Sequence, residues 1–391
     1  MKRFIFKILA LTAAMTLAGG IQAIAQDDIV NEILANSPRL KALSAECASQ
    51  QEALRQSTHF NYQPEVEFER LWSDGTENRW SLGVSQSFDW PGVYKRRRQS
   101  AALQTTAYEY LYATEMQNMA VEARLSIAQC VYAAKRLAVL NAIAENITKI
   151  KALVNEGYEK GQLTVLDVRK LDFEEYSLNN RIDDARQELE LARQQVNALA
   201  GKDVKLDLSA YAPQQLMALD YYLEKCVTNN KQIEAEKQNA ESARAMARVA
   251  SAERMPAITL GYKHAYEEHN HFNGISIGVS LPIFTTKAGE KAAQMQAQSL
   301  DFKSMQTAAD VQGRQRALYT NAVQRNKYLA GIQKVVLDNN YPSLLMMAYK
   351  GGQINVISYL QELNYFVEAR MDYLSAEYSY IQDLTQLNKY N

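Results

Sequence analysis

The sequence predicts a mainly α-helical fold with an internal duplication and two β-hairpins. Three observations support this prediction. A Tyr-x-x-Gly motif occurs twice, each copy stands between long runs whose apolar residues recur at helical spacing, and four segments of about ten residues alternate apolar and polar side chains. The two copies of the motif and the two pairs of alternating segments are separated by almost the same number of residues along the sequence. This constant separation indicates two equivalent halves of one chain.

Residues 1–25 have the pattern of a signal peptide. Basic residues open the segment, an apolar run too short to cross a bilayer as a helix follows, and an Ala-Ile-Ala cleavage site ends at Ala25. No cysteine follows that site, so a lipid anchor is not expected. We therefore expect an exported chain that begins at Gln26.

Composition and charge exclude several classes of protein. The formal net charge is −1 and becomes −4 when Lys2, Arg3 and Lys7 are removed, so no basic surface for nucleic acid is expected. The mean hydropathy is −0.35, and we expect no membrane-spanning helix in the mature chain. Any insertion into a membrane is therefore expected to use strands.

Neither the cysteines nor any motif indicates a catalytic or cofactor site. The three cysteines are odd in number and widely spaced, so buried small residues are expected rather than disulfides or metal ligands: Cys47, Cys130 and Cys226. There is no Gly-rich phosphate loop, His-Glu-x-x-His motif or Ser-His-Asp pattern. We predict that the protein is not an enzyme and needs no cofactor.

The helical runs and hairpins define two structural repeats, 26–215 and 216–391. In each repeat a helix is followed by a β-hairpin, a long helix, a corner at the motif and a return helix. The hairpins are expected at 64–90 and 256–284, the corners at 156–164 and 348–355, the long helices at 95–155 and 287–350, and the return helices at 162–200 and 354–389.

The corners are expected to be helix–turn–helix connections. One reads YEKGQLTVLD from Tyr158 and the other YKGGQINVIS from Tyr349, with Gly161 and Gly352 as the helix stops. Beside them, apolar residues alternate spacings of three and four, which is the seam of a coiled coil. These residues are Leu140, Ile143, Ile147, Ile150 and Val154 in the first repeat, and Leu363, Val367, Met371, Leu374, Tyr378 and Ile381 in the second.

The four alternating segments predict strands with one apolar face. In the first, Val66 and Phe68 alternate with three carboxylates, and turns are expected at Asp74-Gly75 and His269-Asn270. The apolar faces could pack on helices in a soluble domain, or they could face lipid. We favour lipid, because each hairpin is followed by a helix far too long to cover it. Four strands cannot close a barrel, so a homo-oligomer is expected.

This order of elements resembles that of the TolC-type outer-membrane efflux factors. The length of the chain favours the cation-efflux (CzcC- or CusC-like) branch of that family. The resemblance covers essentially 28–391 and rests on the paired corners and hairpins. It implies a homotrimer with a twelve-stranded outer-membrane β-barrel and a coiled-coil α-barrel that extends into the periplasm of a Gram-negative cell. It also implies that 202–228 and the chain ends form a belt around this tunnel.

The resemblance implies a function and partners as well. The chain would be the exit duct of a tripartite efflux pump, with a periplasmic adaptor (membrane fusion protein) and an inner-membrane pump, most often of the RND type, as partners. Heavy-metal cations are one candidate cargo. Two alternatives stay open: a type I secretion duct for a protein or peptide, and a non-conducting periplasmic coiled-coil protein.

By the same resemblance, the corners are periplasmic tips that contact the adaptor. The residues concerned are Tyr158, Gly161, Leu163, Tyr349, Gly352 and Ile354. Asp167 corresponds to an acidic residue near the tunnel aperture, where a ring of carboxylates would select cations. In the second repeat the matching position is Ser358, and Gln361 lies three residues further on; neither is acidic, so a doubly acidic aperture is not expected. The alternative for Asp167 is a residue that stabilises a helix N-terminus.

The hairpins carry two further candidate sets. Glu65, Glu67 and Glu69 are expected to line the lumen of the barrel. A dense group of His and Glu residues near the second turn could bind zinc, copper or nickel, although polar loop residues are the simpler interpretation. The weak candidate ligands are His264, His269 and His271, with Glu267 and Glu268 beside them.

Overall fold

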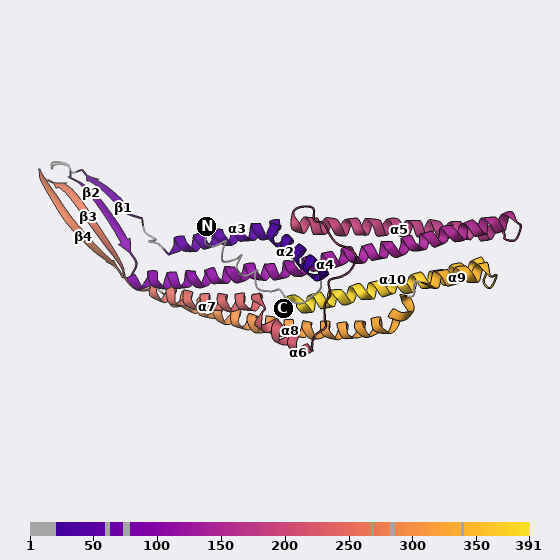
Figure 1. Ribbon diagram of the computed structural model, residues 1–391. Helices are drawn as coiled ribbons and strands as arrows, with labels where there is room; N and C mark the ends of the chain where they lie inside the picture. Colours follow the sequence, from indigo (N-terminus) through magenta and orange to yellow (C-terminus); the bar gives the residue numbers. More distant parts are fainter. Residues whose placement is uncertain (1–20, 59–62, 73–78, 268, 282–285, 338–339) are drawn as a thin grey trace. The chain divides into compact units, whose positions relative to one another are not determined.

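The computed structural model describes residues 21–58, 63–72, 79–267, 269–281, 286–337 and 340–391, with side chains from residue 26 onward. Figure 1 colours the chain along its sequence. The elements are α2 (Ile21–Asn36), α3 (Pro38–Ser57), β1 (Glu65–Leu71), β2 (Arg79–Phe88), α4 (Pro91–Glu159), α5 (Val165–Ala200), α6 (Leu219–Thr228), α7 (Lys231–Ala252), β3 (Ala257–Glu267), β4 (Asn270–Ser280), α8 (Ala288–Val336), α9 (Tyr341–Lys350), α10 (Val356–Leu387) and the short 3-10 helix η1 (Asn388–Tyr390).

The predicted class, long helices with four strands, is confirmed. Three parts of the sequence predictions lie outside the described residues: most of the signal peptide, the Asp74-Gly75 turn, and residues 268 and 282–284 of the second hairpin.

The chain divides into two compact units. The corner unit comprises Met1–Arg39, Asn118–Tyr222 and Gln315–Asn391, and the sheet unit comprises Leu40–Gln117 and Leu223–Arg314. Each unit takes equivalent elements from both predicted repeats, because the corner unit holds both corners and the sheet unit holds both hairpins. The repeats are a division along the sequence, and their boundaries stay a prediction.

In the corner unit, one apolar cluster joins the helices of both corners. The predicted seam of α4 is buried along its length, from Leu140 to Val154, and it packs with residues of α5, α9 and α10. Of the second predicted stripe, on α10, Leu363, Val367 and Leu374 are buried, and Met371, Tyr378 and Ile381 are half-buried. The coiled-coil pattern therefore identified the buried faces of these helices correctly, because apolar side chains three and four apart share one face.

The long helix predicted over 287–350 is not continuous, so this prediction was wrong. Helix α8 ends at Val336, and α9 begins at Tyr341 with Pro342 in its first turn. Proline has no N–H to donate and disfavours helical geometry in the residue before it, so it suits the start of a helix and not its interior. By contrast, α4 and α5 span the expected runs, and α5 ends at Gly201 with φ of 67°.

In the sheet unit the two hairpins form one antiparallel sheet with the order β1-β2-β3-β4. The hairpins meet where β2 pairs with β3, with Leu82 opposite His264 and Val84 opposite Tyr262. In the described chain β1 and β4 are the outer strands of this sheet, each paired on one side only (Figure 1). The residues of both strands are exposed along their length.

Two other expectations concern the helices. All three cysteines are buried and free of disulfides, as predicted, and burial raises the pKa of the Cys130 thiol to about 11.

The expectation of no membrane-length helix needs a correction. Within the described residues, α4 is long and apolar enough over part of its length to cross a membrane. Because core helices of water-soluble proteins share these properties, length and composition do not assign α4 to a bilayer.

Candidate functional site

The two corners have the same backbone geometry. Gly161 and Gly352 both have φ of 68°, a left-handed conformation that L-residues rarely adopt. The N–H of Gly161 donates to the carbonyl of Tyr158 at 2.9 Å, and the N–H of Gly352 donates to that of Tyr349 at 3.0 Å. A Cβ at either glycine would meet nothing within 4 Å, so the backbone conformation alone requires glycine here.

A capping residue starts the helix that follows each corner. The Asn355 side chain accepts from the N–H of Ser358 at 2.8 Å. In the first corner Thr164 and Asp167 form a reciprocal capping box, in which the Asp167 carboxylate accepts from the Thr164 hydroxyl at 2.7 Å and from its N–H at 3.0 Å. These bonds, first the hydroxyl and then the N–H, lower the pKa of the Asp167 carboxyl.

Asp167 therefore has a local structural role whether or not it also lines a tunnel. Its charge reaches the second corner, because burial and then the negative charge of Asp167 raise the pKa of the Tyr349 phenol. Gln361 is exposed on α10. The neighbouring Glu362 instead accepts a hydrogen bond from the Tyr341 hydroxyl at 2.9 Å. The negative charge of Asp167 thus acts on a residue of the second corner, which the sequence did not indicate.

The predicted tip residues divide into packed and exposed side chains. Leu163, Ile354 and Tyr349 pack against the shared apolar cluster, whereas Tyr158 is 47% exposed. Sequence reasoning missed a set of exposed apolar residues around the same corners: Val165, Leu166, Leu344, Met347 and Ile357. Their signal was available, because each is an apolar residue outside the coiled-coil seam. An exposed apolar group at a helix end is typical of a contact surface.

The sheet has two chemically different faces, because successive side chains of a strand point to opposite sides. One face carries the apolar residues of all four strands, including Val66, Phe68, Ile275, Ile277 and Val279, and these side chains are exposed in the single chain. Monomeric soluble proteins rarely expose so large a contiguous apolar surface.

The other face is polar and lined with small residues. Glu69 accepts from the Ser81 hydroxyl at 3.2 Å and lies 3.4 Å from the Lys263 ammonium, while Arg79 pairs with another carboxylate at 2.6 Å. Glu65 and Glu67 are exposed, and the structure shows no ion pair to either within the described residues. The three predicted lumen carboxylates thus share one face, but only Glu69 is partly neutralised.

The predicted His and Glu group is divided between these faces. His264 and His271 lie side by side on the apolar face, with ring nitrogens 3.4 Å apart. Glu267 lies on the polar face, where it pairs with Arg79. His269, in the turn, has φ of 68°. In the described parts of the chain no group of three or more His, Cys, Asp or Glu side chains could hold a metal ion.

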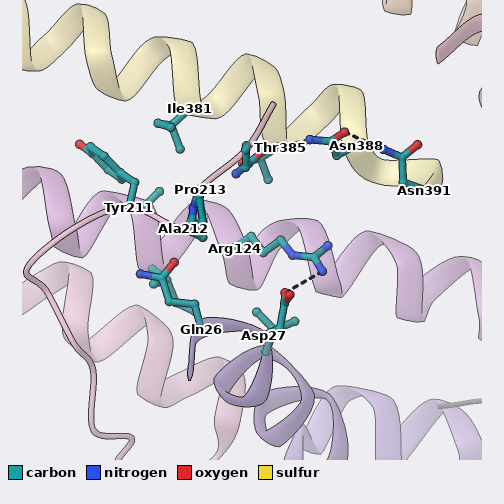
Figure 2. A pocket seen from close by; sticks show the side chains of 14 residues that line it. Gln26, Asp27, Arg124, Tyr211, Ala212, Pro213, Ile381, Thr385, Asn388 and Asn391 are labelled. Carbon is teal, nitrogen blue, oxygen red and sulfur yellow. Dashed lines mark hydrogen bonds and ion pairs between the residues drawn. The ribbon is translucent and has the colours of Figure 1, made fainter. Parts of the chain in front are cut away.

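A cavity of about 280 Å³ in the corner unit was not anticipated (Figure 2). An ion pair between Arg124 and Asp27 at 3.2 Å borders it, and the Gln26 amide donates to a backbone carbonyl at 3.0 Å. Among the residues that the structure describes, the buried Tyr211 hydroxyl at its edge has no hydrogen-bond partner. The lining comes from α2, α4, residues 211–214, α10, η1 and the last residue, Asn391, and no sequence motif links these distant segments. The groups can hydrogen-bond a polar molecule, but they form no catalytic arrangement.

Comparison with solved structures shows channels of the same fold. The chain superposes on the outer-membrane channel OprN with a TM-score of 0.76 and 16% identity over 93% of this chain and 89% of that one. It superposes on the Campylobacter jejuni outer-membrane channel CmeC with a TM-score of 0.71 and 14% identity, over 93% of this chain and 84% of that one. It superposes on CusC, a protein that forms a transmembrane channel, with a TM-score of 0.70 and 14% identity, over 97% of this chain and 95% of that one.

The fold is therefore that of outer-membrane channels, and these neighbours are channels and not enzymes. CusC covers more of both chains, but its TM-score and sequence identity are no greater than those of the other two, so the cation-efflux branch is not singled out. No protein-family model and no curated protein sequence matches the chain.

Proposed function

We propose that this protein is the outer-membrane exit duct of a tripartite efflux system, a passive conduit with no catalytic activity. The observation that carries the proposal is the sheet, which has an exposed apolar face, an opposite polar face and two outer strands with unpaired edges. A bilayer requires every backbone polar group to be paired, so such a sheet fits a membrane only as part of a closed barrel.

Closure requires other copies of the chain, and we propose a homotrimer. Four strands are too few for a barrel, whose smallest members have about eight, whereas β1 and β4 of successive copies can pair edge to edge. The helices support the same idea, because α5 exposes apolar side chains away from its packed seam, including Leu166, Phe173, Tyr176 and Leu191. These would be covered by a neighbouring copy.

We propose that the corners contact a periplasmic adaptor, and through it an inner-membrane pump of the RND type. The glycine turns present Tyr158, Met347 and Ile357 as exposed apolar groups. Buried apolar anchors of this kind contribute most of the energy in protein interfaces. We place the chain in the outer membrane of a Gram-negative cell, with the helices extending into the periplasm.

Heavy-metal cations are the first cargo to test, because the sequence leans towards the cation-efflux branch. A duct for proteins or peptides in type I secretion would use the same architecture. The pump and not the duct is expected to select among them.

Planar-bilayer conductance of the purified protein tests the proposal. We expect detergent-dependent extraction, heat-labile trimers on gels, and discrete cation-selective conductance steps. Asp167→Asn keeps an oxygen for the capping box but removes the charge, so it should lower cation selectivity if Asp167 lines the aperture. Unchanged steps would remove the aperture assignment and leave the duct. A well-folded protein that stays in plain buffer without detergent would refute the duct and favour a periplasmic coiled-coil protein.

A further inference from the structure

The turn end of strands β3 and β4 places two histidines in contact on the apolar face of the sheet. The Nε2 atom of His264 and the Nδ1 atom of His271 are 3.4 Å apart. Two nitrogens bound tetrahedrally to one zinc ion, each at about 2.0–2.1 Å, are themselves roughly 3.3 Å apart. The observed separation therefore matches what a shared metal ion requires, and a metal would replace the N–H···N contact between the rings.

A neighbouring amide sets the protonation of the first histidine. The Oδ1 atom of Asn273 accepts from the Tyr262 hydroxyl at 2.6 Å and also lies 2.7 Å from Nδ1 of His264. Since this oxygen has only acceptor capacity, His264 donates its Nδ1–H to it. The lone pair of His264 is then on Nε2, the atom that faces His271. Metal-binding histidines are commonly oriented in this way, by a hydrogen bond from the ring nitrogen that does not bind the metal.

Aromatic rings enclose the pair. The Trp80 ring centroid is 5.5 Å from that of His264, and the Tyr266 centroid is 5.2 Å from that of His271. His264 is half-buried beside Trp80, whereas His271 is exposed and can adjust its ring to an incoming ion. The pair therefore combines one fixed imidazole with one adjustable imidazole, beside the turn that ends the two strands.

We propose that His264 and His271 form a two-histidine site for a divalent transition-metal ion, with Asn273 as the residue that positions His264. Imidazole ligands favour Cu²⁺, Ni²⁺ and Zn²⁺ and not Mg²⁺ or Ca²⁺, and among these Cu²⁺ binds most tightly. Two protein ligands leave coordination positions for water, so the ion is exchangeable. The site lies on the face opposite the carboxylates proposed for the lumen, and is therefore separate from the conduit. A bound ion would link β3 to β4 beside their turn.

Trp80 provides a built-in reporter, because Cu²⁺ bound within contact distance quenches tryptophan fluorescence. Cu²⁺ is titrated into the purified full-length protein in detergent, with Mg²⁺ as the negative control. We expect saturable quenching by Cu²⁺ that is lost in Trp80→Phe. His264→Phe and His271→Phe keep an aromatic ring in place but remove the ligand nitrogen, and each should weaken binding by about tenfold or more, as expected when one of two ligands is lost.

Two further variants separate this site from general binding by histidine. Asn273→Leu keeps both imidazoles but removes the positioning oxygen, and should weaken binding by about 10- to 100-fold. His269→Asn is the matched control in the same turn, because asparagine tolerates a positive φ, and it should bind Cu²⁺ like wild type. Equal binding by wild type and both His→Phe variants, or an equal loss in His269→Asn, would overturn the proposal. The titration requires only the folded chain, so its result is independent of conductance.

Discussion

Replacing either corner glycine by alanine should open that corner locally by a calculable amount. Both glycines have φ of 68°, and an added Cβ would meet nothing within 4 Å, so the cost is purely conformational. For an L-residue this conformation costs about 1–2 kcal/mol. Gly161→Ala and Gly352→Ala should each destabilise their corner by that amount. Hydrogen–deuterium exchange should then accelerate about 5- to 30-fold in the peptide that contains the substitution.

Gly331 is the matched control for this experiment. It lies in the interior of α8 in the same unit, and an added Cβ there also meets nothing within 4 Å. Gly331→Ala should stabilise the helix by about 0.5–1 kcal/mol, since alanine is the better helix former. Gly161→Asn should fall between alanine and wild type, because asparagine tolerates positive φ. If Gly161→Ala exchanged like wild type, or if Gly331→Ala were as harmful, the backbone explanation of the corners would be refuted.

Three other predictions follow from particular side chains. The pKa of Asp167 is lowered in the folded state. Its contribution to stability is therefore present above the unfolded pKa of about 3.9 and is lost as pH falls through the folded pKa. The free energies of unfolding of wild type and Asp167→Asn, measured by denaturation, should differ at pH 6 and converge at acid pH. The double variant Glu65→Gln/Glu67→Gln should reduce cation selectivity in bilayers more than Glu69→Gln does, because Lys263 of β3 already neutralises Glu69. An equal effect would contradict the pairing of Glu69 with Lys263. The buried Cys130 thiol, with its pKa near 11, should resist thiol reagents at pH 8 until the protein is denatured, and rapid labelling of the native protein would contradict its burial.

The parts of the fold that could be predicted depend on local rules. The corner geometry follows from Gly161 and Gly352, because only a few neighbouring residues determine where a helix stops. The two faces of each strand follow from the alternation of apolar and polar side chains with a period of two residues. The buried seam of α4 follows from apolar residues spaced three and four positions apart. The break before α9 was predictable too, since Pro342 is visible in the sequence, and the expected continuous helix overlooked it.

The candidate site could be predicted only in part, and the histidines illustrate why. The sequence places five His and Glu residues together near one turn, but it does not say which ones meet. Strand register assigns His264 and His271 to one face and Glu267 to the other, where it pairs with Arg79. A shift of one residue would have exchanged these faces. The predicted lumen carboxylates were easier, because three alternate residues of one strand share a face in any register.

By itself, the sequence determined the duplication, the helical corners, the two-faced strands and the positions of the buried seams. Each of these depends on residues close together in the chain, through backbone conformation and side-chain periodicity. Only the tertiary structure decided that the two hairpins join as one sheet, that the charge of Asp167 reaches Tyr349, and that a cavity forms beside Tyr211. These features join segments many residues apart, and their contacts depend on how whole helices and strands pack, which no local pattern specifies.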